Sequence, residues 1–309
     1  MVRMYISVRD FVVREVAKAL GNENRLAKTL KYLGVNAIEL EYFSDGRYYL
    51  LEPEEGQDNR GLIKKERCEL LRTQLLRHGI RISAFLMHNN FGDTNMTRQI
   101  EWIIRCIEAA EYFKVKAVRI DPIIKTDRDV SIEEAAHMSA KALREVFSQI
   151  SMDKKVSLAI ENHGKYGNNP EFLRKVIANV NDDRLGLTLD SGNFYWYGFS
   201  LEEVYNIFEE FAPLVRHTHL KNIKYPDEIK SKRRDIGYKY EKYVYPIYGG
   251  DIDHSRFVEI LKKVGYEEDL CIEDESLGKY SPEEVLDIMK KDVEYLKGLI
   301  VKYQDNDDS

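Results

Sequence analysis

The stretch RLGLTLDSGNFYWYGFSLEEVYNIFEEFAPLVRHTHLKN, residues 184–222, contains one complete strand–helix–strand unit. Its apolar runs at 185–190 and 215–221 have the length and composition of buried strands. Between them, 200–211 shows the apolar spacing of an amphipathic helix. Because strands joined through a helix lie parallel in one sheet, this unit predicts an α/β fold.

The same alternation continues along the whole chain of 309 residues. The strands are predicted at 4–8, 36–42, 80–87, 116–122, 155–162, 185–190, 215–221 and 269–274. A helix is predicted after each strand, the first ending near Gly34 and the others at 62–79, 96–113, 131–150, 169–180, 200–211, 253–265 and 281–300. Eight such units predict a closed (β/α)8 TIM barrel. An open doubly wound sheet is the alternative, which is disfavoured because no glycine-rich phosphate loop follows the first strand.

No segment resembles a linker, so we expect one domain over 1–303 followed by a disordered tail at 304–309. Two long connections, 43–61 and 222–252, follow the second and seventh strands. Both belong to the C-terminal rim, where the active sites of TIM barrels lie. We interpret 222–252 as a lid or a subunit contact, the latter consistent with a homo-oligomer; contact with a phosphorylated or glycosylated substrate is the alternative.

The composition indicates a soluble globular protein without general affinity for nucleic acid. Hydrophobic residues make up 43% of the chain, charged residues 32%, and the net charge is −6. No apolar run is long enough to span a membrane, and Arg9 and Asp10 interrupt the first one too early for a signal peptide. Three cysteines without a CxxC pair favour a cytoplasmic location.

Polar residues gather at the C-terminal ends of the predicted strands. Alternation along each strand directs a set of charged and imidazole side chains inward: Glu39, Glu41, Arg119, Asp121, Glu161, Asp190, His217, His219, Lys221 and Glu273. Buried charges must be paired or bound to metal. One interpretation is a structural ion network. The other is a metal site, which we favour because three carboxylates and an imidazole converge from four successive strand ends. Such ligands suit Mn²⁺, with Mg²⁺, Co²⁺ or Zn²⁺ as alternatives.

Five motifs occur in order along the second half: LAIENHG (158–164), LTLDSGNF (187–194), HTHLKN (217–222), PIYGGDID (246–253) and LCIEDES (270–276). Together they resemble the sugar phosphate isomerase/epimerase superfamily of xylose isomerase-like TIM barrels. LGVNAIELEY and HGIRISAFLMHNNF in the first half match less specifically. The resemblance implies that Glu161, Asp190, His219 and Glu273 bind one divalent metal ion. It also implies that Glu161 and Glu273 act as acid and base.

By the same resemblance, we expect an isomerase or epimerase that acts on a keto-sugar through an ene-diolate. We expect its substrate to be a small carbohydrate and expect no nucleic-acid or membrane partner. The chain departs from the ketose 3-epimerase branch at Asn193, where that branch has histidine, and at Tyr225, where it has arginine. The resemblance therefore does not extend to free-ketohexose 3-epimerase activity.

Further residues are predicted to contact the substrate: His163, Asn193, Lys221, Glu39, Arg119 and His88. For Lys221 the alternative is a salt bridge to Glu273 or Asp253, and for Glu39 and Arg119 it is a buried ion pair. The strand phase sets His217 one layer deeper than His219, as a hydrogen-bonded core residue. His254 is expected on a surface.

Three other functions compete with this interpretation. A lyase on the same scaffold, such as a keto-inositol dehydratase or a keto-glycoside-cleaving enzyme, would use the same proton abstraction. A DNA-repair enzyme of the endonuclease IV type would need several zinc ions and more histidines at the strand ends. A non-catalytic barrel would bind no metal.

Overall fold

The computed structural model describes residues 4–22, 25–52, 62–64, 67–151, 153 and 155–304. Its main sheet has eight parallel strands in the order β12-β1-β2-β5-β6-β7-β8-β9. The strands are β1 (Tyr5–Arg9), β2 (Ala37–Glu41), β5 (Arg81–Leu86), β6 (Ala117–Ile120), β7 (Ser157–Glu161), β8 (Leu185–Asp190), β9 (Val215–His219) and β12 (Asp269–Ile272). They coincide with the eight predicted strands.

The two outer members of this order, β9 and β12, also meet. The backbone N–H of Leu220 donates to the carbonyl of Cys271 at 2.8 Å, and that of Glu273 donates to the carbonyl of Leu220 at 2.9 Å. These bonds close the barrel. The prediction of a TIM barrel is therefore confirmed, and the open doubly wound sheet is excluded.

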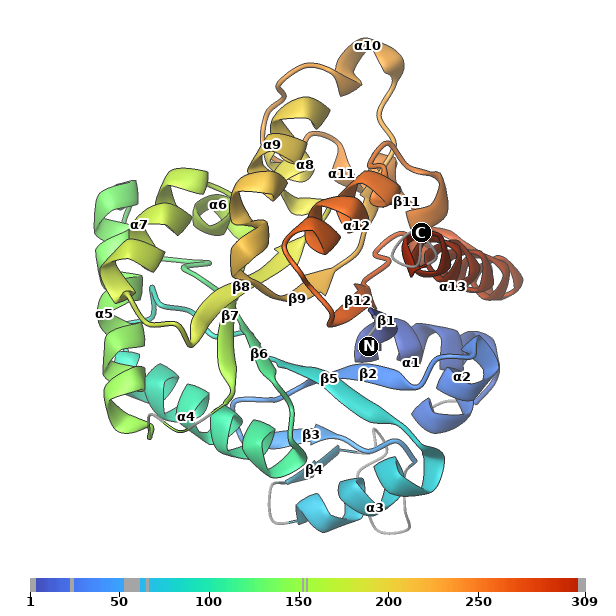
Figure 1. Cartoon of the computed structure of the whole chain (residues 1–309), viewed down its shortest axis with the longest axis horizontal. Coiled ribbons are helices and arrows are strands. Elements are labelled where there is room, and N and C mark those ends of the chain that lie inside the picture. The colour runs from blue at the N-terminus through green and yellow to red at the C-terminus, as the bar shows by residue number, and fades with distance from the viewer. Residues whose placement is uncertain are drawn as a thin grey trace.

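Helices surround the strands, as Figure 1 shows. The longer ones are α1 (Asp10–Ala19), α2 (Leu26–Leu33), α3 (Cys68–His78), α4 (Met96–Phe113), α5 (Ile132–Gln149), α7 (Pro170–Val180), α9 (Leu201–Phe211), α12 (His254–Lys263) and α13 (Pro282–Gln304). Local signals begin several of them: Ser200 and Glu203 form a capping box on α9, and Asn169 caps α7 ahead of Pro170. Since α13 continues to Gln304, that residue is helical and not part of a tail, whereas 305–309 lie outside the described residues.

The prediction of a helix over the whole of 62–79 is wrong at its start. Leu62–Lys64 forms the strand β4, which pairs antiparallel with β3 (Arg47–Tyr49), and the helix begins only at Cys68. Tyr48 of β3 is buried and packs against Phe85 and Phe113, with ring centroids 6.4 and 6.0 Å away. This long-range pairing outweighs the local helical pattern.

The long loop, residues 222–252, is folded against the barrel and lies on the other side of the view from β3 and β4 (Figure 1). It contains β10 (Asn222–Ile223), β11 (Val244–Tyr245), α10 (Asp227–Lys230), α11 (Tyr240–Tyr243) and a 3-10 turn (Ile247–Gly249). Arg234 fastens it: the guanidinium donates to the carbonyls of Tyr195 and Phe199 at 3.0 and 2.6 Å and lies over the rings of Tyr195 and Tyr225. The loop is thus held beside the C-terminal ends of β8 and β9.

Within the described ranges, no helix is long and apolar enough to cross a membrane.

Candidate metal centre

Four side chains meet at the C-terminal end of the barrel. Glu161 and Asp190 end β7 and β8, His219 ends β9, and Glu273 follows β12. One potential ligand atom from each lies within 4.8 Å of the others, and all four residues are buried. The strand register explains the convergence, since Asp190 and His219 are direct partners across β8 and β9. The structure therefore brings together the four residues that were predicted to hold a metal.

The donor set fits a divalent cation. Asp190 Oδ2 and Glu273 Oε2 are buried, and neither accepts a well-oriented hydrogen bond from any described residue. The ammonium of Lys221 lies 3.2 and 3.0 Å from these two oxygens. Buried carboxylate oxygens without full compensation are costly, and a small divalent ion among them would supply it. Three carboxylates with one imidazole are suitable ligands for Mn²⁺ or Zn²⁺.

The ring of His219 has its two nitrogens in different surroundings. Nδ1 lies 2.7 Å from Glu161 Oε1 and 3.1 Å from Glu273 Oε2, and so faces the four-residue cluster. Nε2 lies 2.9 Å from Oε2 of Glu39, a fully buried residue on β2. Burial alone would raise the pKa of Glu39, but His219 and His217 hold it well below its usual range. Glu39 is thus an ionised group behind His219.

His217 lies one layer deeper and is fully buried. Its Nδ1 is 2.9 Å from Asp269 Oδ1, and its Nε2 is 2.9 Å from Glu39 Oε1. Burial opposes protonation of the ring, but Asp269 and Glu39 outweigh it and raise the pKa of His217 well above its usual value. His217 is therefore an imidazolium held between two carboxylates, and its nitrogens do not face the four-residue cluster.

Lys221 lies just above the cluster and is 5% exposed. Besides Asp190 and Glu273, its ammonium contacts Glu275 Oε1 at 2.8 Å. Burial would lower the pKa of Lys221, but Asp190 and Glu275 raise it, so the side chain is charged. The alternative salt bridge to Glu273 is present, whereas Asp253 accepts from the backbone N–H of Ser255 at 2.8 Å as the cap of α12.

A second group of predicted residues lies beside Glu161. Arg119 is buried and forms ion pairs with Glu161 and, at 2.9 Å, with Asp121, and is not paired with Glu39. Asp121 also contacts His163 Nδ1 at 2.7 Å and His88 Nδ1 at 3.5 Å. The two imidazoles are 40% and 46% exposed, whereas Arg119 is buried.

Asn193 supports Asp190 through its backbone. Its N–H and that of Gly192 donate to Asp190 Oδ1 at 2.7 and 2.8 Å. Its side-chain Nδ2 is buried and has no hydrogen-bond partner among the described residues. Burial, opposed by Lys221 and reinforced by Glu161, raises the pKa of Asp190 to about 6.

Reasoning from the sequence missed three residues of this site. Arg9, at the end of β1, forms an ion pair with Glu273 and lies 3.3 Å from His88 Nε2. Glu275 contacts Lys221 and accepts a hydrogen bond from the hydroxyl of Tyr240 in the long loop. The alternation that placed the other strand residues would also have placed Arg9 inside, but no local pattern pointed to Tyr240.

His254, which was expected on a surface, is fully buried. Its Nε2 lies 3.1 Å from Ser191 Oγ, next to Asp190. The first turn of α12 packs against the loop after β8, which covers the ring. Burial lowers the pKa of His254 to about 4, so the ring is neutral near pH 7.

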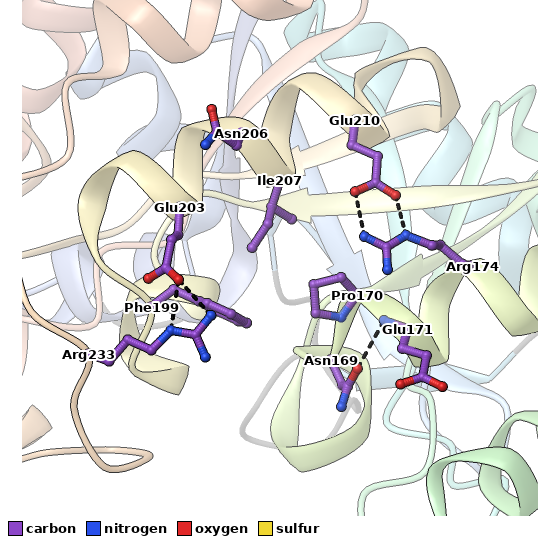
Figure 2. Close-up of a pocket in the computed structure, with 10 residues that line it drawn as sticks. All are labelled: Asn169, Pro170, Glu171, Arg174, Phe199, Glu203, Asn206, Ile207, Glu210 and Arg233. Carbon is purple, nitrogen blue, oxygen red and sulfur yellow. Dashed lines mark hydrogen bonds and ion pairs between the residues drawn. The ribbon is translucent and has the colours of Figure 1, made fainter.

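A surface groove on the outer side of the barrel is separate from this centre. Figure 2 shows it between α7, α9 and the long loop, with Pro170 and Ile207 on its walls. Its arginines are already paired, Arg174 with Glu210 at 2.8 Å and Arg233 with Glu203 at 2.7 Å (Figure 2). None of the four clustered residues lines it, so the groove is not the candidate active site.

The protein is a TIM barrel in which three carboxylates and one imidazole meet at the C-terminal ends of the strands. The family described as xylose isomerase-like TIM barrel matches residues 27–299, and the chain belongs to it.

Individual proteins that resemble this chain share only a modest part of its sequence. An inosose dehydratase of Yersinia enterocolitica (serotype O:8 / biotype 1B) is 26% identical over 132 residues, which span 41% of this chain and 44% of that protein. The crystal structure of the IolI protein with a zinc atom has a TM-score of 0.66 at 20% identity and covers 97% of this chain and 99% of that one. A D-tagatose 3-epimerase-like protein has a TM-score of 0.65 at 19% identity, with 97% and 100% covered. At such identities the two structures show a shared fold.

Proposed function

We propose that this protein is a divalent-metal-dependent isomerase or epimerase, and that its substrate is a sugar or sugar derivative with a carbonyl group. The observation that carries the proposal is the convergence of Glu161, Asp190, His219 and Glu273 within 4.8 Å in a buried site. Membership of the xylose isomerase-like family supports it. We propose Mn²⁺ as the ion, with zinc, which the IolI structure contains, as the first alternative.

A divalent ion at this centre would polarise the substrate's carbonyl and acidify the neighbouring C–H bond. Glu161 and Glu273 project from β7 and the end of β12, with β8 and β9 between them in the barrel. They can therefore reach a substrate from different sides. One carboxylate removes the proton, and the other, once protonated, returns a proton to the opposite face, which inverts the carbon.

Other residues of the centre would bind and orient the substrate. The charged ammonium of Lys221 is placed to stabilise negative charge that develops on the substrate oxygens. Asn193 offers its free amide N–H, and His163 and His88 offer exposed imidazoles anchored on Asp121. These groups suit a small polyhydroxylated molecule. We also propose a cytoplasmic location, which the free thiols of Cys68, Cys106 and Cys271 support.

A dehydratase is the second candidate, favoured by the similarity to the inosose dehydratase. It would begin with the same removal of a proton next to the carbonyl. The substrate would then lose a β-hydroxyl as water, protonated by the second carboxylate, to give an enone. The ketose 3-epimerase branch has histidine at the position of Asn193 and arginine at that of Tyr225. These two differences support a reaction other than 3-epimerisation.

The experiment that separates these outcomes follows the substrate's α-hydrogen. Metal-loaded protein is incubated in D₂O with ketoses, keto-inositols and keto-glycosides, and deuterium incorporation is measured by NMR. Isomerisation or epimerisation gives a deuterated isomer, whereas dehydration gives a growing enone absorbance. Full activity after the metal has been removed with a chelator would refute the proposal.

A further inference from the structure

Besides the set of Glu39, His217, His219 and Cys271, in which the carboxylate is already paired with both imidazoles, one more set of potential metal ligands adjoins the four-residue cluster. Asp121, Glu161 and His163 each offer one ligand atom, and these atoms lie within 4.8 Å of one another. Glu161 belongs both to this set and to the four-residue cluster. Two ions that share a carboxylate would form a binuclear centre, which is a common arrangement in hydrolytic enzymes. The two sets together therefore offer ligands for two ions.

The guanidinium of Arg119 lies among these three ligands. Its Nη2 pairs with Glu161 Oε2, lies 2.9 Å from Asp121 Oδ1 and lies 3.4 Å from His163 Nδ1. Its Nη1 donates to the carbonyl of Met87 at 2.7 Å, which anchors the group from below. Arg119 is 2% exposed, so solvent does not displace it.

A guanidinium is protonated at any pH that a folded protein survives. Arg119 thus supplies a permanent positive charge to two buried carboxylates, Glu161 and Asp121, which would otherwise need another cation. Because its Nη2 contacts all three candidate ligands, an ion cannot approach them without expelling the arginine. Expulsion would leave a buried charge unpaired, which is strongly unfavourable.

We propose that Arg119 takes the place of a second divalent cation and restricts this centre to one metal ion. The inference rests on the proposed metal site of Glu161, Asp190, His219 and Glu273, and identifies the residue that keeps a second ion away from it. It also bears on the class of substrate. A centre with one ion cannot hydrolyse a phosphodiester by a mechanism that needs two ions, as in a DNA-repair nuclease. A single ion suits proton transfer next to a carbonyl.

The test is the metal content of the full chain, saturated with Mn²⁺ and measured by native mass spectrometry. Wild-type protein is expected to bind one ion and to give the electron paramagnetic resonance spectrum of isolated Mn²⁺. Arg119→Ala is expected to bind two ions with an exchange-coupled spectrum. Arg119→Lys, which keeps the positive charge, is the matched control and is expected to bind one ion. In Arg119→Ala/His163→Ala the second ion should be lost again.

The possible outcomes distinguish the two proposals. Wild-type protein without any bound ion would refute the metal site itself. Two ions in wild-type protein would leave that site standing and overturn the role of Arg119, and so would a folded Arg119→Ala protein that binds only one. If Arg119→Ala does not fold, Arg119→Gln serves as the second variant, since its neutral amide cannot replace the charge.

Discussion

The Nε2 atom of His219 lies 2.9 Å from Oε2 of Glu39, while Nδ1 of the same ring faces Glu161 at 2.7 Å. An ionised Glu39 accepts a hydrogen bond only from a protonated Nε2, so a neutral His219 directs its Nδ1 lone pair toward the carboxylate cluster. The same carboxylate is held from below by His217. The core of the barrel thereby sets the orientation and the tautomer of the proposed metal ligand.

Glu39→Gln is therefore expected to weaken metal binding although Glu39 is not a ligand. The amide can no longer act as a carboxylate toward both imidazoles, and loss of such a partner typically lowers metal affinity by about 10–100-fold. Competition with a chelating dye measures the change. Glu41→Gln, on the same strand, is the matched control and should bind metal as the wild type does. Unchanged affinity in Glu39→Gln would contradict the assignment.

The two histidines of β9 should respond differently to replacement. His219→Ala is expected to lose bound metal and activity, because it removes a ligand. His217→Ala is expected to keep the metal but to lose roughly 3–5 kcal/mol of stability, since Glu39 and Asp269 lose their buried cation. Metal analysis and urea unfolding measure the two effects. Equal metal loss in both variants would show that the strand phase has been misassigned.

Metal affinity should begin to fall as the pH drops through the pKa of His219, which is raised above its ordinary value of 6.5, and should fall more steeply below about pH 6, where Asp190 is protonated too. Burial and the neighbouring Glu161 raise the pKa of Asp190 to about 6, although Lys221 opposes them. The pKa of His219 is also raised, by Glu39 and Glu161 against the effect of burial. Both groups must lose a proton before they can bind the metal. Below the pKa of each group, the metal affinity therefore falls about tenfold for every pH unit. Calorimetry in buffers of different ionisation enthalpy measures the protons, and a flat pH profile would refute this account.

His254 should make stability depend on pH in a separate window. Its pKa is lowered by burial from 6.5 to about 4, so the unfolded chain takes up the proton first. The contribution of the neutral ring is complete above pH 6.5 and is lost as the pH falls toward 4, by about 3 kcal/mol. In His254→Gln this loss is absent. The stability difference between wild type and variant should shrink toward low pH in urea unfolding; a constant difference would argue against a buried neutral imidazole.

Tyr240→Phe tests whether the long loop takes part in the reaction. The variant loses the hydrogen bond to Glu275, which pairs with Lys221 above the metal ligands. We expect kcat/KM to fall roughly fivefold, as for about 1 kcal/mol of a lost hydrogen bond, with metal affinity unchanged. Tyr238→Phe in the same loop is the control. An equal loss of activity in both variants would indicate a general effect on the loop.

The eight strands and the inward phase of their polar residues could be predicted from the sequence alone. A strand's side chains alternate with a period of two, so the apolar residues around Glu161, Asp190 and His219 determine which way each polar side chain points. Closure of a parallel barrel then brings the ends of neighbouring strands to one place. For this reason, local periodicity predicted that polar side chains converge at one end of the barrel, and the family resemblance singled out four of them as metal ligands.

Contacts between segments that are far apart in the chain could not be predicted from the sequence and became visible in the folded protein. The pairing of β3 with β4, the burial of His254 under the loop after β8, the ion pair of Arg9 with Glu273 and the bond of Tyr240 to Glu275 belong to this class. Each depends on packing and backbone pairing that no local pattern encodes. The barrel and the direction of its charged side chains follow from local alternation along the chain, whereas three-dimensional packing determines which charges neutralise one another.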